Sequence, residues 1–323
     1  MKALVFDRFG GPEVLHIADV HDPVPMTGQA LVRTRAIGLN FADCYRRQGR
    51  YHLAGDPPWI AGYEAAGEVV SAPPDSGFKP GDRVAFADAP YANAELVSVD
   101  AERLIPLPDD IGFETAASLL LQGLTAQYLI RDSHHVVGGE TVLVHAAAGG
   151  VGQLLVRLAK AEGAKVFALA STAEKCAVAL AAGADAAATY DQDWVARAHA
   201  FGMRDGLSGV DVVYDSVGST VHDSLRAART GGHVVFYGMA GGDPAPVDPR
   251  LLMDGSKSLT GGDLWNVLRS AEERRSRSTE LFARVRDNAL TIAIDARYPL
   301  AEGATAHAHL ESRRALGKIL LIP

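Results

Sequence analysis

The chain has 323 residues, which is long enough for about two domains. Its 48% hydrophobic and 22% charged residues are typical of a globular protein, and no segment approaches the ~20 unbroken apolar residues of a membrane span. The net charge of -8 argues against nucleic acid or an anionic membrane as the main partner.

The cysteines and the first residues of the chain favour a reducing compartment. The sequence contains two cysteines, Cys44 and Cys176, and they lie so far apart that a disulfide framework is excluded. Asp7 and Arg8 interrupt the first apolar run, so the N-terminus lacks the apolar stretch of a secretory signal. We therefore expect a cytoplasmic protein.

Short β-type runs separated by glycine and proline occupy the chain from its start to about residue 120. Turn sequences such as Phe9-Gly10-Gly11-Pro12 and Lys79-Pro80-Gly81-Asp82 lie between these runs. This pattern predicts an antiparallel, barrel-like domain. The expected strands are Lys2–Phe6, Ala30–Ala36, Ala66–Ser71, Arg83–Phe86 and Ala94–Val97.

From about Glu114 the pattern changes, because helical stretches rich in alanine and leucine alternate with short apolar strands. This alternation predicts a parallel sheet with helices on both of its faces. The last segment, from about Ile292, is expected to return to the first domain as strands. The expected strands of the second domain are Thr141–Ala146, Lys165–Ala168, Ala186–Thr189, Val210–Asp215 and His233–Tyr237, and its expected helices are Gly150–Glu162, Ala173–Ala182 and Thr220–Ala227.

A glycine cluster between an expected strand and an expected helix carries the functional argument. The motif Ala147-x-Gly149-x-x-Gly152 matches the dinucleotide-binding fingerprint, with alanine in place of the first glycine. Glycines are needed there because the backbone turns tightly and approaches a pyrophosphate closely, while the helix N-terminus presents N–H groups to it. The motif therefore predicts nucleotide binding rather than a plain strand–helix turn.

The end of the next strand indicates which nucleotide is bound. A site that selects NAD usually carries Asp or Glu about 20 residues past the first glycine, where it holds the ribose 2′-hydroxyl. This chain has Leu169-Ala170-Ser171-Thr172 there, followed by Lys175. A missing carboxylate and a nearby cation favour the 2′-phosphate of NADPH. The alternative is that Lys175 is a solvated helix lysine offset by Glu174.

At these residues the sequence resembles the quinone oxidoreductase or ζ-crystallin branch of the medium-chain dehydrogenase/reductase superfamily, over essentially the whole chain. The matching blocks are Gly139-Glu140-x-x-Leu143, Ala147-Ala148-Gly149-Gly150-x-Gly152, Ala36-Ile-Gly-Leu-Asn-Phe-Ala-Asp43, Gly62-Tyr-Glu-Ala-Ala-Gly67, Gly81-Asp-Arg-Val84, Leu121-Gln-Gly-Leu-Thr125, Tyr214-Asp-Ser-Val-Gly218 and Gly317-Lys-Ile-Leu-Leu-Ile-Pro323.

The resemblance implies an α/β fold in which a Rossmann doubly wound parallel sheet is inserted into a GroES-like, β-barrel-type catalytic domain. It places the GroES-like domain in residues 1–121, completed by 290–323, and the NADPH-binding domain in 122–289. It also implies a homodimer formed by edge strands of the two Rossmann sheets.

The resemblance further implies which residues line the site. Tyr45 and Tyr51 look like the aromatic residues of the substrate side, and with Asn40 they are the candidate catalytic residues. The implied cofactor-binding residues are Ala148, Gly149, Gly150 and Val151 at the pyrophosphate, Ser171, Lys175 and Tyr190 at the 2′-phosphate and adenosine ribose, Ser216 and Val217 beside the cofactor, Asn40, Thr125, Tyr237, Gly238 and Met239 near the nicotinamide, and Arg313 near the adenosine.

The same comparison argues against a metal. Zinc relatives in the superfamily carry Cys, His and Cys or Asp ligands together with a four-cysteine lobe, whereas this chain has Asn40 and Tyr63 at two of the ligand positions and two cysteines in total. Without zinc, no Lewis acid would stabilise an alkoxide, so direct alcohol dehydrogenation is not expected.

We therefore expect transfer of a hydride from NADPH to a quinone or an α,β-unsaturated carbonyl, with the protein supplying orientation and electrostatics. Two alternatives remain open from the sequence. One is a dedicated enoyl reductase of a biosynthetic pathway, and the other is an NADPH-binding protein with little turnover.

Overall fold

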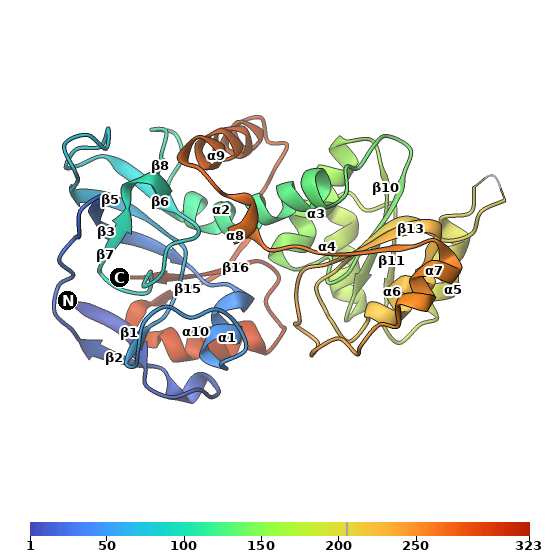
Figure 1. The fold of residues 1–323 in the computed structure, drawn as a ribbon, viewed down its shortest axis with the longest axis horizontal. Coiled ribbons are helices and arrows are strands. Elements are labelled where there is room, and N and C mark those ends of the chain that lie inside the picture. Colours follow the sequence, from blue (N-terminus) through green and yellow to red (C-terminus); the bar gives the residue numbers. More distant parts are fainter. Residues whose placement is uncertain (205) are drawn as a thin grey trace. The chain divides into compact units, whose positions relative to one another are not determined.

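The computed structural model describes residues 1–204 and 206–323, and the contacts within it divide the chain into two compact units. The first unit comprises Met1–Leu121 together with Leu268–Pro323, and the second comprises Gln122–Val267. Each unit contains its own cluster of buried apolar side chains, and the chain's course through both can be followed in Figure 1. Within the described residues, no helix has the length and apolar character needed to span a membrane.

Two sheets form the framework of the first unit. The larger sheet has the order β15-β16-β3-β5-β6-β8, with β7 also paired to β3, and the smaller has the order β2-β1-β4. Their described strand pairs are antiparallel except for β15 with β16. The strands are β1 (Lys2–Phe6), β2 (His16–Asp19), β3 (Gln29–Gly38), β4 (Trp59–Ile60), β5 (Ala65–Ser71), β6 (Arg83–Phe86), β7 (Leu96–Asp100), β8 (Ile105–Pro106), β15 (Ile294–Pro299) and β16 (Lys318–Ile322).

The helices of the first unit are α1 (Phe41–Arg47), α9 (Ala271–Arg286), α10 (Gly303–Glu311) and the first part of α2 (Phe113–Tyr128). The membership of α9 differs from the expected boundary at residues 289 and 290, which assigned this helix to the nucleotide-binding domain. One contact of α9 with the first unit is a buried ion pair, because Arg274 Nη2 lies 2.7 Å from Asp88 Oδ2. Arg286 of the same helix pairs with Asp110, and α9 also contacts β8, so several contacts hold the helix in the first unit.

The second unit is built on a six-stranded parallel sheet with the order β11-β10-β9-β12-β13-β14, which is the strand order of a Rossmann sheet. Every residue of β9 and β12 is buried, as expected for strands covered on both faces. The strands are β9 (Thr141–Val144), β10 (Lys165–Ala170), β11 (Ala186–Thr189), β12 (Val210–Asp215), β13 (Ala228–Phe236) and β14 (Ser258–Gly261).

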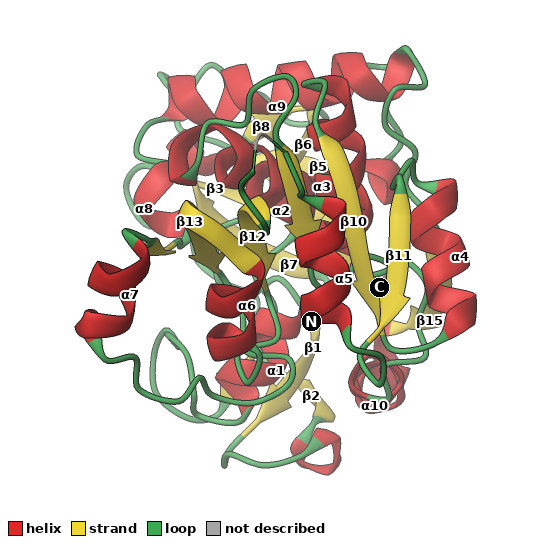
Figure 2. Ribbon diagram, turned by 90° about the vertical axis from the view of Figure 1, so that its right-hand side faces the viewer, coloured by secondary structure: helices red, strands yellow, loops and turns green. Residues whose placement is uncertain are grey.

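Two pairs of helices pack against this sheet. Helices α3 and α4 contact each other and strands β9, β10 and β11, whereas α5 and α6 contact each other and strands β10, β12 and β13. Figure 2 shows α4 beside β11 and α6 near β13. The helices are α3 (Gly150–Ala161), α4 (Ala173–Ala181), α5 (Trp194–Phe201), α6 (Val221–Ala227), α7 (Pro249–Gly255) and α8 (Leu264–Val267).

The first unit contains a fully buried histidine that determines part of its response to acid. His307 of α10 lies with Nδ1 3.9 Å from Cys44 Sγ of α1. Burial, together with the nearby Arg47 guanidinium, lowers the pKa of His307 from 6.5 to about 3. Between these two values the unfolded chain binds a proton that the folded chain does not. The stabilisation is therefore complete above pH 6.5 and is lost as the pH falls toward 3.

We predict that His307→Gln makes the free energy of unfolding less sensitive to acid. Between pH 7 and pH 5 the native protein should lose about 2 kcal/mol more than the variant, because only the native chain carries this buried, uncharged imidazole. Urea unfolding at both pH values measures the difference, and His21→Gln, at an exposed position, is the control. Equal losses in native protein and His307→Gln would contradict the prediction.

Candidate functional site

The expected cofactor residues of the second unit, apart from Thr125, follow the ends of five parallel strands. Because parallel strands end at the same edge of a sheet, the loops after them lie along one edge. The chain order reverses between β9 and β12, which is where open sheets of this kind bind their ligands. The loops and the first turns of the helices that follow them supply Ala148–Val151 after β9, Ser171 and Lys175 after β10, Tyr190 after β11, Ser216 and Val217 after β12, and Tyr237–Met239 after β13.

The glycine loop, residues 146–152, has no room for a side chain at the last glycine of the fingerprint. A Cβ at Gly152 would collide with the backbone carbonyl oxygen of Ala146, whereas a Cβ at Gly149 would approach the same oxygen only to 3.2 Å. Ala146 itself has a left-handed backbone with φ of 46°, which costs about 1–2 kcal/mol for a residue other than glycine. No side chain caps α3 at Gly149, so the positive end of the helix dipole faces out of the loop.

The loop after β10 presents a hydroxyl and a lysine. The side chain of Thr172 caps α4, because its Oγ1 accepts a hydrogen bond of 3.2 Å from the backbone N–H of Lys175. This cap places Lys175 in the first turn of α4, with Ser171 exposed at the end of β10. The donors at this position are those that a phosphate requires.

The loops after β12 and β13 are joined by backbone hydrogen bonds. The N–H of Ala240 donates to the carbonyl of Ser216 at 3.0 Å, and the N–H of Gly241 donates to the carbonyl of Val217 at 2.8 Å. Gly218 has a φ of +86°, and a Cβ there would lie 2.2 Å from the carbonyl oxygen of Gly242. The structure therefore brings Ser216 and Val217 together with the segment that contains Met239.

Tyr190 lies over the start of the glycine loop. Its hydroxyl oxygen is 3.2 Å from His145 Nδ1 and accepts a hydrogen bond of 3.0 Å from the backbone N–H of Ala146. On the other side of the imidazole, His145 Nε2 is 2.9 Å from Ser224 Oγ, which donates to Asp215 Oδ2 at 2.6 Å. Ser224 thus links His145, directly after β9, to Asp215, the last residue of β12.

In the first unit, Asn40 is part of a buried network with Glu64 and Lys318. The Lys318 ammonium lies 2.6 Å from Glu64 Oε2 and 2.8 Å from Asn40 Oδ1. Because an ammonium can only donate, it fixes the orientation of the Asn40 amide. Nδ2 of Asn40 then donates to the carbonyl of Gly38 at 3.2 Å and to Glu64 Oε2 at 2.9 Å.

The members of this network are shielded from water. The exposed fractions of Glu64, Lys318 and Asn40 are 0%, 1% and 4%. Burial raises the pKa of Glu64 above its usual value, whereas Lys318, Asn40 and the backbone N–H of Leu121 oppose that shift. With three donors directed at its two oxygens, the carboxylate form remains well solvated by the protein itself.

A second buried cation lies beside the tyrosines. Arg46 stacks on Tyr63 with its guanidinium carbon 3.5 Å from the ring centroid, and the same carbon lies 5.0 Å from the ring centroid of Tyr51. Its Nη1 is 3.2 Å from Asp43 Oδ1, and its Nε donates to the carbonyl of His52. Arg46 therefore holds the segment that carries Tyr51 against Tyr63.

The remaining expected residues are distributed between the units. Tyr45 is half-buried on α1, with its ring centroid 6.4 Å from that of Phe41, and Arg313 is exposed after α10 with a φ of 57°. Both belong to the first unit, whereas Thr125 lies buried on α2 in the second. Among the residues that the structure describes, no group of three His, Cys, Asp or Glu side chains is arranged to hold a metal ion.

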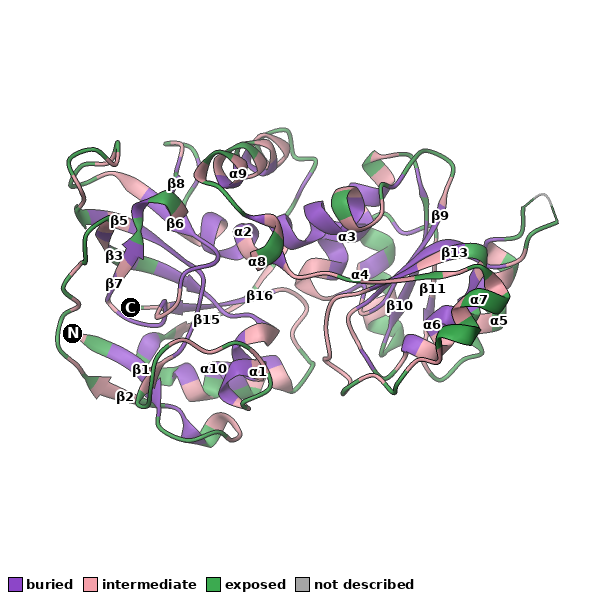
Figure 3. Ribbon diagram, in the orientation of Figure 1, coloured by how far each residue is buried: buried purple, intermediate pink, exposed green. Residues whose placement is uncertain are grey.

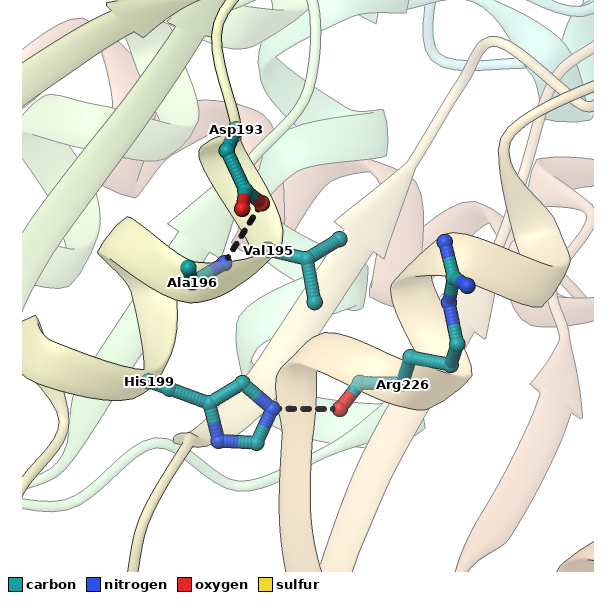
Figure 4. A pocket seen from close by; sticks show the side chains of 5 residues that line it. All are labelled: Asp193, Val195, Ala196, His199 and Arg226. Atoms are coloured by element: carbon teal, nitrogen blue, oxygen red, sulfur yellow. Dashed lines mark hydrogen bonds between the residues drawn. The ribbon is translucent and has the colours of Figure 1, made fainter.

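A hollow between α5 and α6 shares no residue with the expected site (Figure 4). Its polar groups already have partners within the protein. Asp193 Oδ1 accepts the N–H of Ala196 as a helix cap, His199 Nε2 is 2.9 Å from the carbonyl oxygen of Arg226, and the Arg226 guanidinium pairs with Asp223. We assign this hollow no part in the function.

Sequence reasoning missed the partners that hold the candidate residues in place, namely Glu64 and Lys318 in the first unit and His145, Ser224 and Asp215 in the second. A usable signal is present for three of them. Lys318 begins the apolar strand KILLI, and His145 and Asp215 end apolar strands. A polar residue within or directly after a buried strand requires a partner, but the sequence does not say which one.

Two family models match the chain. The model described as alcohol dehydrogenase GroES-like domain matches residues 26–141, and the model described as zinc-binding dehydrogenase matches residues 150–276. A quinone oxidoreductase from Pseudomonas aeruginosa is 40% identical over 326 residues, which cover 100% of this chain and 99% of that protein. A 2-haloacrylate reductase from a Burkholderia species is 37% identical over 335 residues and 99% of its own length.

Solved structures show the same likeness. The structure of an Escherichia coli quinone oxidoreductase complexed with NADPH superimposes with a TM-score of 0.95 at 36% identity, covering 100% of both chains. The chain is thus similar over its full length to quinone oxidoreductases and to a 2-haloacrylate reductase.

We predict that Lys318→Met lowers the free energy of unfolding by about 3–5 kcal/mol, because it leaves the buried carboxylate of Glu64 without its cation. Adding Glu64→Gln to this variant should restore much of that loss. Lys2→Met is the matched control, since Lys2 forms a 2.8 Å but exposed pair with Asp19, and its removal should cost far less than removal of the 2.6 Å buried pair. Chemical denaturation measures all four proteins, and equal costs for Lys318→Met and Lys2→Met would refute the argument.

Proposed function

Because this chain belongs to the quinone oxidoreductase branch of the medium-chain dehydrogenase/reductase family, we propose that it reduces quinones or α,β-unsaturated carbonyl compounds with NADPH and without a metal. The chain is an NADPH-dependent, quinone oxidoreductase-like enzyme. The glycine loop, with its uncapped α3 N-terminus and no space for a side chain at Gly152, is the observation that carries the proposal.

The residues of the second unit fit this cofactor. The backbone of Ala148–Val151 and the N-terminus of α3 suit the pyrophosphate, and Ser171 and Lys175 suit a 2′-phosphate. Ser216, Val217 and the Tyr237–Met239 segment belong to the two joined loops at the same sheet edge. The remaining members of the proposed set are Thr125 of the second unit and Asn40 and Arg313 of the first. When bound, NADPH supplies the hydride.

The proposed class of acceptor depends on how the negative charge produced by hydride transfer is stabilised. A hydride that reaches a conjugated carbon pushes an electron pair onto the carbonyl oxygen, and a proton from water then completes the reduction. Hydrogen-bond donors can stabilise this delocalised charge, whereas a simple ketone concentrates it on one oxygen and requires a stronger electrophile. The similarity to a 2-haloacrylate reductase supports this class, because an acrylate is a conjugated double bond.

We assign the donor role to Tyr45 and Tyr51 and a positioning role to Asn40. Asn40 is a member of the candidate catalytic set, but its two amide hydrogens are directed at the carbonyl of Gly38 and at Glu64 Oε2. Its contribution is to connect the Glu64–Lys318 pair to the start of α1, where its backbone N–H donates to Asp43 Oδ2 at 3.0 Å.

We also propose that the enzyme is a cytoplasmic homodimer, with β14 pairing against β14 of a second copy. β14 ends the described sheet, so one of its edges is available for pairing. The neighbouring helix α7 has no buried residue, and Leu251 and Met253 on it are 50% and 70% exposed (Figure 3). A second copy of the chain, related by a two-fold axis, would cover both β14 and α7.

We predict that Lys175→Ala weakens NADPH binding far more than NADH binding. Loss of one charge-assisted contact to a phosphate costs about 1.5–3 kcal/mol, or roughly a 10- to 100-fold rise in the Kd for NADPH. Fluorescence titration of both nucleotides measures this. Lys165→Ala is the control, because Lys165 is exposed at the opposite end of β10. Equal affinity of the native protein for the two nucleotides would overturn the NADPH preference.

We predict that turnover with C4-deuterated NADPH places deuterium on the conjugated carbon of enones and acrylates and leaves unconjugated ketones unreduced. Tyr45→Phe and Tyr51→Phe should each lower kcat about tenfold, as expected for a contact of ~1.4 kcal/mol. Dialysis against a chelator should leave turnover unchanged. Deuterium on a ketone carbonyl carbon, complete loss of activity in either variant, or inactivation by the chelator would contradict the mechanism.

We predict that Met253→Glu converts the dimer to a monomer, because it buries a charge against its symmetry mate. Sedimentation analysis measures the mass, and Met203→Glu, at a methionine that is 61% exposed elsewhere, should leave the dimer intact. A native protein that sediments as a monomer of 34.1 kDa would refute the proposed assembly.

A further inference from the structure

A continuous chain of buried hydrogen bonds runs beneath the carboxyl ends of β9 and β12. It begins at Asp215, passes through Ser224 of α6 and His145, and reaches the hydroxyl of Tyr190. The exposed fraction of Asp215, Ser224 and His145 is 0%. Trp194 closes the space beside the imidazole, in an edge-to-face contact with a centroid distance of 5.2 Å.

The direction of each hydrogen bond follows from the donors and acceptors present. Asp215 also receives hydrogen bonds from the N–H groups of Val217 and Gly218, so it acts as a carboxylate that only accepts. Ser224 has one hydrogen, and at 2.6 Å the carboxylate takes it. The serine oxygen must then accept from His145 Nε2.

This arrangement fixes the tautomer of His145. Burial lowers the pKa of His145, although the Asp215 charge opposes that shift, so the imidazole is neutral near pH 7. A neutral imidazole with its hydrogen on Nε2 has a bare Nδ1 that can only accept. The hydroxyl of Tyr190, 3.2 Å away, therefore donates its only hydrogen to His145.

The oxygen of Tyr190 is then an acceptor, and it receives the backbone N–H of Ala146. Ala146 is the left-handed residue at the entrance of the glycine loop, and its carbonyl accepts the N–H of Gly149 at 2.8 Å. The same carbonyl lies where a Cβ on Gly152 would collide. The end of the hydrogen-bond chain thus holds the residue from which the loop takes its shape.

We propose that Tyr190 is a positioning residue of the glycine loop and not a donor to the 2′-phosphate: the chain Asp215–Ser224–His145–Tyr190 fixes Ala146, and so supports the pyrophosphate site common to NADPH and NADH. This assignment rests on the proposed function, because it concerns how that nucleotide is held. A phosphate only accepts hydrogen bonds, and a phenol whose hydrogen is already used has nothing to offer it.

The test compares two nucleotides that differ only in the 2′-phosphate. The Kd values of the apoprotein for NADPH and NADH are measured by fluorescence titration in native protein, Tyr190→Phe and the control Lys175→Ala. Tyr190→Phe should weaken both nucleotides by the same factor, about tenfold, and leave their ratio unchanged. Lys175→Ala should shift the ratio toward NADH.

A change of the NADPH/NADH ratio in Tyr190→Phe beyond threefold, or no effect on either nucleotide, overturns the inference. If Tyr190→Phe does not fold, Ser224→Ala breaks the same chain at an earlier link and is held to the same two outcomes. Absence of NADPH binding by the native protein overturns the proposed function as well, so the two failures are distinguishable.

The donor and acceptor assignment along these hydrogen bonds can be tested separately in the protein without nucleotide. Nitrogen-15 NMR of the His145 imidazole should show the neutral tautomer with hydrogen on Nε2 in native protein. Tyr190→Phe should keep this tautomer, because Ser224 still requires the hydrogen, while the Nδ1 resonance moves as its donor is lost. A native tautomer with hydrogen on Nδ1 reverses the Tyr190 hydrogen bond and refutes the assignment.

Discussion

A carboxylate that is removed from water must be surrounded by donors, and two such carboxylates organise this protein. Glu64 in the first unit is matched by the ammonium of Lys318 and the amide of Asn40. Asp215 in the second unit is matched by two backbone N–H groups and the hydroxyls of Thr220 and Ser224. Because an unpaired buried charge costs several kcal/mol, each carboxylate fixes the backbone and side chains that serve it.

These two matched carboxylates support different parts of the proposed chemistry. The Asp215 network connects the loop after β12 with the glycine loop after β9, which is the proposed pyrophosphate site. The Glu64 network fixes the start of α1, which carries Tyr45, and the stacked Arg46 holds the segment that carries Tyr51. Such preorganisation avoids the reorganisation that flexible polar groups would undergo during hydride transfer.

Much of the fold could be predicted from the sequence, because the relevant signals are local. The expected strands Ala186–Thr189 and Val210–Asp215 match β11 and β12, and the glycine cluster lies between β9 and α3 as the fingerprint requires. The expected return of the chain to the first unit lies at residue 290, whereas the first compact unit resumes at Leu268. The helix α9 between these positions pairs with residues far away in the sequence, Arg274 with Asp88 and Arg286 with Asp110.

The sequence by itself determined the parallel sheet, the position of the glycine loop, the neutral residues after β10 and the family to which the chain belongs. These properties depend on residues that are neighbours along the chain. Only the tertiary structure shows that Lys318 binds Glu64, which lies 254 positions away in the sequence, and that Ser224 forms a hydrogen bond with His145, 79 positions away. It also decided that the Asn40 amide and the Tyr190 hydroxyl are engaged inside the protein. A hydrogen bond depends on distance and direction in space, and no local pattern records which distant partner satisfies a buried polar group.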